Sequence, residues 1–262
     1  MKKKLVVVTG IVMLALTACG GMQSKEEKQS SEPEVKQEQL GGSLTVYCGA
    51  GMQKPFQEIA DVFEKETGCK MNVTYANAAQ IQTQILESQE GDFFIAGSSE
   101  ELKPVSDYVL ESVELVKHIP VLAVAEENEK GISGLLDLTR DDVQTVIGDP
   151  ESTPIGKIAK KAFADYQITD AVHLAATTTT APQLATVISM GEADAAIIWK
   201  ENANAEGVEI CETEDLDSYV KTIPAAKLTF LEDSKAADAF FEFLQSDTTQ
   251  KIWTSYGYEV VK

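Results

Sequence analysis

The sequence predicts an α/β protein of two lobes, in which each lobe is a mostly parallel β-sheet flanked by helices. Short runs rich in β-branched and aromatic residues alternate with longer segments of helical apolar spacing, which is the rhythm of βαβ units. A chain of 262 residues is long enough for two lobes that each bury a core. Two extended runs, 118–124 and 221–226, each contain an Ile-Pro pair and are suited to carry the chain between the lobes.

The first half of the chain alternates three predicted strands with three predicted helices. Gly68 is the expected end of the first helix, and Asn77 is the expected N-cap of the second. The expected strands cover 44–48, 71–75 and 92–95, and the expected helices cover 55–67, 78–88 and 100–110.

The second half repeats this alternation. The expected helices cover 135–143, 153–166, 181–190 and 234–256, and the expected strands cover 144–148 and 193–199. With the two Ile-Pro runs as hinge crossings, the first lobe would consist of 43–120 plus 223–262, and the second lobe of 121–222.

The N-terminus has the pattern of an export signal. Three lysines at 2–4 precede an apolar run, 5–16, that is shorter than the roughly 20 residues a membrane-spanning helix needs. The run ends in Leu-Thr-Ala-Cys19, which resembles a bacterial lipobox, so 1–18 is the expected lipoprotein signal peptide and Cys19 the lipidated residue. Residues 19–42, rich in Ser, Glu, Gln and Lys, are the expected disordered tether. The sequence therefore predicts a protein anchored by lipid to the extracytoplasmic face of the cell membrane.

Composition excludes several classes of function. The chain has 22 basic and 42 acidic residues, and the 19 basic residues left after the signal peptide bring the net charge to −23. A chain this acidic is unsuited to nucleic acid, because phosphate neutralisation needs clustered Lys and Arg. Of the two histidines, His118 begins an expected hinge strand, and His173 lies in a segment with no Cys or carboxylate at metal-ligand spacing. The sequence also contains no Gly-x-Ser-x-Gly, phosphate-loop or Cys-x-x-Cys motif. We therefore expect no enzyme, no cofactor and no metal.

The remaining cysteines, Cys48, Cys69 and Cys211, are expected to be free thiols. Their number is odd, and the first two lie at opposite ends of neighbouring predicted strands, beyond the reach of a disulfide.

Five segments occur in an order and spacing that resemble the molybdate- and tungstate-binding proteins of bacterial ABC importers. They are the Leu-Thr-Val-Tyr strand at 44–47, Phe-Glu-Lys-Glu-Thr-Gly at 63–68, the run 84–95, Ile-Gly-Asp-Pro at 147–150 with Pro-Ile-Gly at 154–156, and 191–199. This resemblance implies a type II periplasmic-binding-protein fold, a monomer that holds its solute between two lobes, and an ABC permease in the membrane as its partner.

The family's ligand hydroxyls are absent from this sequence. By resemblance, two serines and a tyrosine would contact the oxyanion, but those places fall on Gly51, Ala78 and Trp199. Helix N-termini can hold an anion through backbone N–H groups instead, and the Asn77 amide, the Trp199 indole N–H and the threonine run 177–180 offer further donors. The expected ligand-binding residues are Gly51, Met52, Asn77, Ala78, Ile155, Thr180, Ala181 and Trp199.

Alternative interpretations stay open at this point. The missing hydroxyls are equally consistent with a different small solute that uses the Trp199 face or Glu201, although an exposed acidic residue is the default for Glu201. Asn77 and Thr180 are also typical helix caps, and Met52 and Trp199 typical core residues. A surface structural lipoprotein and an enzyme are the remaining, more remote classes.

Overall fold

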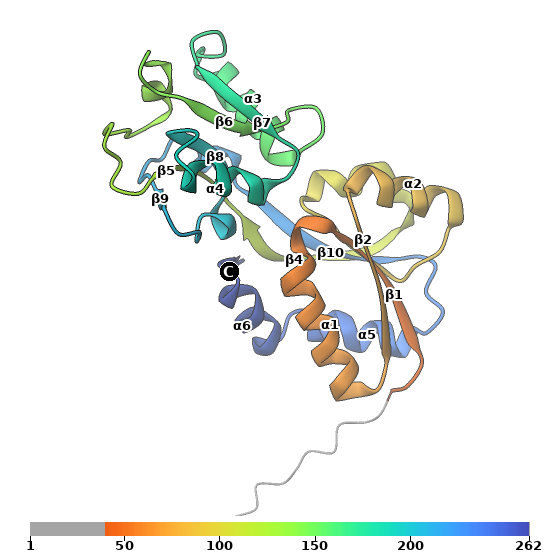
Figure 1. Ribbon diagram of the computed structural model, residues 1–262. Coiled ribbons are helices and arrows are strands. Elements are labelled where there is room, and N and C mark those ends of the chain that lie inside the picture. Colours follow the sequence, from red (N-terminus) through yellow and green to blue (C-terminus); the bar gives the residue numbers. More distant parts are fainter. Residues whose placement is uncertain (1–39, 262) are drawn as a thin grey trace, which may run out of the picture. The chain divides into compact units, whose positions relative to one another are not determined.

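Two β-sheets form the framework of residues 40–261, the part of the chain that the computed structural model describes (Figure 1). The expected signal peptide 1–18, the expected lipidation residue Cys19 and most of the expected tether 19–42 lie outside the described residues. Residues 40–42 of that tether are described and are not disordered, since Leu40 N–H donates to the Thr67 carbonyl and the Gly42 carbonyl accepts from the Lys70 N–H. The two-lobed α/β class predicted from the sequence is confirmed, since each sheet is flanked by its own helices.

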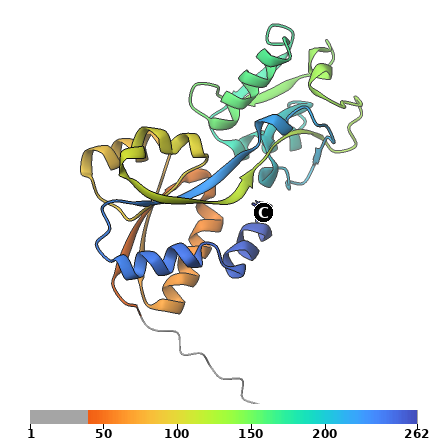
Figure 2. The same cartoon turned by 180° about the vertical axis from the view of Figure 1, so that it is seen from behind.

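Six strands form the first sheet, which draws on both ends of the described chain. In spatial order they are β11 (Glu259–Val260), β4 (Val109–His118), β10 (Lys221–Leu228), β3 (Phe93–Ile95), β1 (Ser43–Gly49) and β2 (Lys70–Ala76). β10 thus returns from late in the chain to lie between β4 and β3 (Figure 2).

Five strands form the second sheet, all from the middle of the chain. In spatial order they are β7 (Leu174–Thr178), β6 (Thr145–Gly148), β8 (Ala195–Trp199), β5 (Pro120–Ala125) and β9 (Val208–Ile210). The chain passes from the first sheet to the second at Ile119, between β4 and β5, and returns between β9 and β10. The exact lobe boundaries at 120 and 223 stay a prediction.

The expectation of mostly parallel sheets is wrong in its proportion. Four strand pairings are parallel, β1 with β2 and β3, and β6 with β7 and β8. The five others are antiparallel, and each of them involves β4, β5 or β10. These three strands flank the two crossings, so they do not belong to βαβ units and carry no parallel constraint.

In the described part of the chain, six α-helices lie against the sheets. They are α1 (Gln53–Thr67), α2 (Ala78–Ser88), α3 (Pro154–Asp165), α4 (Ala181–Ser189), α5 (Ser234–Phe243) and α6 (Asp247–Ser255). In the first lobe, α1, α5 and α6 share a core cluster with one face of the sheet, and α2 shares another with the opposite face. Successive residues of β1 alternate between the two, with Val46 in the first cluster and Tyr47 in the second. In the second lobe, α3 and α4 cover the sheet.

Three expected helices differ from the structure. The segment expected at 100–110 is a 3-10 helix, Ser99–Tyr108, because Pro104 inside it has no N–H to donate. The segment expected at 135–143 is reduced to a 3-10 helix, Leu135–Thr139. The long terminal helix is two helices, α5 and α6, because the Ser246 side chain caps the start of α6. The strands β4, β7, β9 and β11 were not predicted. β7 is an edge strand whose first four residues are exposed, so it lacks an apolar signal.

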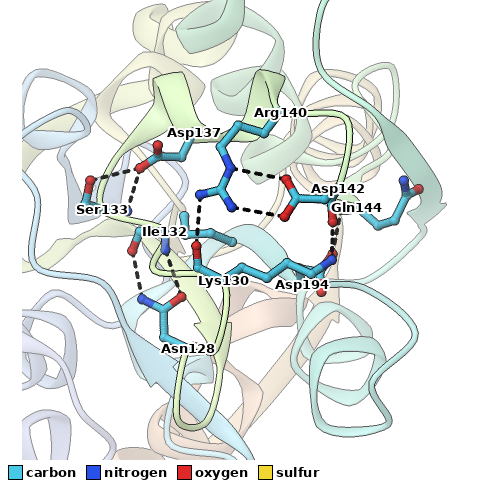
Figure 3. A network of polar contacts seen from close by, with 9 residues as sticks. All are labelled: Asn128, Lys130, Ile132, Ser133, Asp137, Arg140, Asp142, Gln144 and Asp194. Atoms are coloured by element: carbon cyan, nitrogen blue, oxygen red, sulfur yellow. Dashed lines mark hydrogen bonds and ion pairs between the residues drawn. The ribbon is translucent and has the colours of Figure 1, made fainter.

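The chain's only arginine fixes a surface loop. The Arg140 guanidinium donates to both carboxylate oxygens of Asp142 and to the Lys130 carbonyl, and the Lys130 ammonium donates to Asp194, which also accepts from the Gln144 N–H (Figure 3). This network joins the β5–β6 loop to the amino ends of β6 and β8. The Arg140 side chain is therefore already bound, by its ion pair with Asp142 and its bond to the Lys130 carbonyl. It lies at the amino ends of β6 and β8, away from the carboxyl ends where the helices begin.

The predicted free thiols are confirmed for all three cysteines, of which Cys48 and Cys69 are fully buried. Within residues 40–261, no helix combines the length and apolarity that crossing a bilayer requires.

Candidate functional site

The predicted site residues lie at the carboxyl ends of the parallel strands in both sheets. In the first sheet, Gly49 at the end of β1 is in register with Ala76 at the end of β2. In the second, Gly148 at the end of β6 is in register with Thr178 at the end of β7, and β8 runs parallel beside them. Each sheet therefore has one edge where strand ends and helix starts gather, which is where α/β folds bind ligands.

On the edge of the first sheet, two helices begin differently. A short 3-10 turn, Ala50–Met52, leads from β1 into α1, whose first turn has no side-chain cap. Gly51 is exposed, while the Met52 side chain lies in the core. The Asn77 side chain caps α2 by accepting from the Gln80 N–H, and the Gln80 side chain accepts from the Asn77 N–H in return. Half-buried Ala78 is the first residue of that helix.

On the edge of the second sheet, α3 is held tightly against β6. The Thr153 side chain caps α3 by accepting from the Gly156 N–H at 3.0 Å. A Cβ on Gly156 would lie 2.2 Å from the Gly148 carbonyl oxygen, so the close approach of helix and strand requires glycine there. Buried Ile155 is thereby placed at the end of β6.

The start of α4 is open by comparison. Thr180 occupies the N-cap position but makes no side-chain capping bond, and Pro182 follows it in the first turn. The Thr180 hydroxyl and the Ala181 N–H therefore have no partner within the helix. The neighbouring Thr179 donates instead to the Gln183 side chain.

Both edges contact one buried histidine. The His118 ring at the end of β4 lies with Nδ1 3.2 Å from the Gly97 carbonyl oxygen, just beyond β3. Its Nε2 lies 3.0 Å from Glu201 Oε1, just beyond β8, and its ring stacks on Trp199 with centroids 3.5 Å apart. The imidazole thus joins the carboxyl edge of one sheet to that of the other.

Glu201 differs from its expected exposed state. Its side chain is 8% exposed, its Oε1 lies 3.0 Å from His118 Nε2, and it accepts a hydrogen bond from the Tyr258 hydroxyl. Burial and the neighbouring Glu201 charge raise the pKa of Tyr258 far above its usual range, so Tyr258 donates at every physiological pH. Sequence reasoning missed His118, Glu201 and Tyr258 as a group.

A second carboxylate lies near this histidine. Glu101 accepts from the Gly97 N–H at 2.7 Å. Burial raises the pKa of Glu101, against the opposing influences of that N–H group and of the positive charges of His118 and Lys157.

The raised pKa of Glu101 predicts a pH dependence of stability. The folded state binds the proton more tightly than the unfolded chain, so the free energy of unfolding is expected to fall as pH rises from the ordinary value of 4.5 through the raised pKa. Urea unfolding between about pH 4 and about pH 8 measures this slope. A Glu101→Gln variant keeps an acceptor for the Gly97 N–H and should lose the slope.

The neighbouring Glu100 is expected to change stability with pH in the opposite direction. Its hydrogen bond from Lys221 lowers the pKa of Glu100, so its contribution to stability is present above the ordinary value and is lost as pH falls through the lowered pKa. Equal pH slopes for wild type and Glu101→Gln would contradict the assignment to Glu101.

The structure thus groups the predicted residues into two sets, one at the carboxyl edge of each sheet. Their contact with a solute stays a prediction. Trp199 is 6% exposed, with the His118 ring on one face of the indole. Within residues 40–261, no group of three or more His, Cys, Asp or Glu side chains is arranged to hold a metal ion.

Comparison with known proteins places this geometry in context. Residues 44–259 match the family described as bacterial extracellular solute-binding protein. A Haemophilus influenzae protein, provisionally described as a binding protein, is 29% identical over 227 residues, which cover 82% of this chain and 90% of the relative. A Bacillus subtilis protein, provisionally described as an ABC transporter substrate-binding lipoprotein, is 25% identical over 259 residues, covering 95% and 96%.

Two further comparisons concern molybdenum. The molybdate-binding protein of Haemophilus influenzae is 22% identical over 228 residues, which cover 82% of this chain and 89% of that protein. The solved substrate-binding domain of a provisionally assigned molybdenum ABC transporter from Clostridium difficile shares the fold with a TM-score of 0.72 and 24% identity, covering 85% of this chain and 100% of the domain.

Proposed function

Because the chain belongs to the bacterial extracellular solute-binding protein family, we propose that it captures a molybdate- or tungstate-like oxyanion between its two lobes and delivers it to an ABC permease. The names of the Bacillus subtilis and Haemophilus influenzae relatives support both the transport role and the solute class. These relatives are solute-binding proteins rather than enzymes, which fits a role in capture without turnover.

The observation that carries the proposal is that the carboxyl edges of both sheets contact the same residue, His118. Each edge contributes at least one helix start without a side-chain cap, at α1 and at α4. At α4, free first-turn N–H groups and the positive end of the helix dipole attract an anion without any cationic side chain. At α1 the Gln53 N–H already donates to the Ala50 carbonyl, so the Lys54 N–H and the dipole remain. Such local donors matter in a chain with a net charge of −20, because salt screens the repulsive field of the whole protein beyond about 8 Å.

Calorimetric titration and thermal unfolding of the purified protein, each with oxyanions added, test the proposal directly. Molybdate and tungstate are expected to bind and to raise the melting temperature, because a ligand that binds only the folded state stabilises it. Sulfate and phosphate serve as tetrahedral comparisons. If none of the four oxyanions stabilises the protein, the oxyanion assignment is wrong.

A gain-of-affinity variant tests the position of the solute. A Cβ on Gly51 has no atom within 4 Å, so a serine fits there without strain from its surroundings. A hydroxyl that donates to a charged ligand contributes about 1.5–3 kcal/mol, so Gly51→Ser is expected to tighten oxyanion binding by roughly 10- to 150-fold. Gly51→Ala is the matched control, since it adds the Cβ without the hydroxyl. Equal affinities for the two variants would place the solute away from Gly51.

A different small solute is the alternative function, favoured by the absence of side-chain hydroxyls at Gly51, Ala78 and Trp199. The low exposure of Trp199 and the burial of Glu201 speak against a solute held on the indole face or by a free carboxylate. Thermal-shift measurements against small organic anions and cations separate the two functions: stabilisation by one of these, and by no oxyanion, would favour the alternative.

We also propose that the protein is a monomer and that it is anchored through lipid on Cys19; the description of the Bacillus subtilis relative as a lipoprotein supports the anchor. A Cys19→Ser variant should appear in the soluble extracytoplasmic fraction, whereas retention in the membrane fraction would contradict lipidation there.

A further inference from the structure

The pair formed by His118 and Glu201 is among the most buried polar contacts between the two edges. The side chains are 10% and 8% exposed, and they come from β4 and from the turn after β8. Because burial of an uncompensated charge is costly, the protonation of this pair has consequences for any charged solute at the same edges.

The contacts of the His118 ring point to the number of protons the pair holds. The Gly97 carbonyl only accepts, so we assign a hydrogen to the Nδ1 of His118, 3.2 Å away, which then donates to it. The 3.0 Å contact between Nε2 and Glu201 then needs one more proton, on the nitrogen or on the carboxyl oxygen. In either form the pair has no net charge.

Two neighbours favour the imidazolium–carboxylate form. The Tyr258 hydroxyl donates to Glu201, which stabilises the carboxylate. The Trp199 ring lies against the imidazole at an interplanar angle of 19°, and an aromatic face attracts a cation. The His118 ring therefore contacts the Glu201 carboxylate through Nε2 and the Trp199 indole through one ring face.

The charged groups on the surrounding elements do not replace this proton. Glu101 from the 3-10 helix after β3 adds negative charge near His118, and Lys157 of α3 opposes it. Glu259 of β11 binds both Lys117 of β4 and Lys200, which precedes Glu201, so these charges are already paired. Glu100 pairs with Lys221 in the same way.

We propose that His118 is a positioning residue of the solute site: it holds the Trp199 indole in place and supplies the proton that cancels the charge of Glu201. This inference rests on the oxyanion function proposed above. An oxyanion at the edge then meets the indole N–H, for which residues 40–261 provide no acceptor, and no net negative charge. Without that proton, the carboxylate of Glu201 repels the solute.

A pair of substitutions separates this role from simple packing. His118→Phe keeps an aromatic ring on Trp199 but leaves Glu201 charged, so molybdate affinity is expected to fall by roughly 10- to 100-fold. Adding Glu201→Gln removes that charge and should return the affinity to within about threefold of wild type. A purely structural role for His118 predicts no such rescue. His173→Phe, at the chain's other and exposed histidine, is the control and should leave the affinity unchanged.

A fluorescence comparison needs no solute and covers the case in which His118→Phe fails to fold. The Trp253 indole N–H has no hydrogen-bond partner in the described part of the chain, so Trp253→Phe loses none and leaves Trp199 as the only tryptophan. An imidazolium against the indole quenches its fluorescence. At one neutral pH, Trp199 emission is therefore expected to be stronger in a Trp253→Phe, Glu201→Gln protein, which lacks the carboxylate that holds the proton, than in Trp253→Phe alone.

The two measurements fail in distinguishable ways. Equal Trp199 emission with and without Glu201→Gln would overturn the shared proton. Emission that rises with Glu201→Gln, together with an unrescued loss of molybdate affinity, would overturn the role of that proton in solute binding. If wild type binds no oxyanion at all, the proposed function fails and takes the role at the solute with it, while the fluorescence comparison still decides the protonation of the pair.

Discussion

Truncation of Phe240 is expected to cost about 3–5 kcal/mol of the free energy of unfolding, the largest effect of any substitution proposed for this protein. Phe240 on α5 is fully buried and meets three other rings edge-on, with centroid distances of 6.4 Å to Phe56, 4.9 Å to Phe63 and 5.1 Å to Phe93. It thus joins α5 to α1 and to β3, and Phe240→Ala would leave a cavity that all three elements line.

Urea unfolding of Phe240→Ala measures this loss as a lower midpoint. Phe241→Ala is the matched control, because it is the same change at the next, partly exposed residue of the same helix. Its ring contacts Phe93 and lies near the Lys227 ammonium, so a smaller loss is expected. Equal losses for the two variants would show that the ring cluster around Phe240 is not the centre of this core.

The second large effect is expected at Gly156. A Cβ there would lie 2.2 Å from the Gly148 carbonyl oxygen and 2.5 Å from that of Asp149. Both are backbone atoms that cannot rotate away, so α3 must move off β6 in a Gly156→Ala variant. Overpacking of this kind costs about 1–3 kcal/mol. Because the start of α3 would move with it, oxyanion affinity should fall as well.

Gly51→Ala is the control for this effect, since it is the same substitution at the other edge, in open space. Its stability is expected to stay within about 0.5 kcal/mol of wild type. Thermal unfolding of both variants, with and without molybdate, measures the two effects together. A Gly156→Ala protein as stable as Gly51→Ala would mean that α3 and β6 do not need their close approach.

The sequence predicts best the elements with a clear apolar pattern, either a continuous apolar run or a helical spacing. The fully buried β8 and the amphipathic α1 and α3 lie close to their expected positions. The edge strand β7, with its exposed first residues, has no periodic signal to detect. The long antiparallel β4 was missed because the expected helix at 100–110 covered its start, and its alternation is irregular.

The candidate site was predictable only in part. Asn77 as the cap of α2 follows from local sequence, and the gathering of strand ends follows from parallel pairing. The pair His118 and Glu201 joins residues 83 positions apart, and no local pattern connects them. A histidine directly before an Ile-Pro crossing was the one available signal, and it predicted a place in the chain rather than a partner.

The strand order of the first sheet has a consequence for how the chain matures. Residues 120–210 supply every strand of the second sheet in one contiguous stretch, whereas β10 inserts into the first sheet between β4 and β3. A chain made from its N-terminus therefore holds the edges of β3 and β4 unpaired until residues 221–228 emerge. We expect the lobe that comes second in the sequence to be completed first, and the earlier lobe to depend on β10 and the elements that follow it, at 221–260.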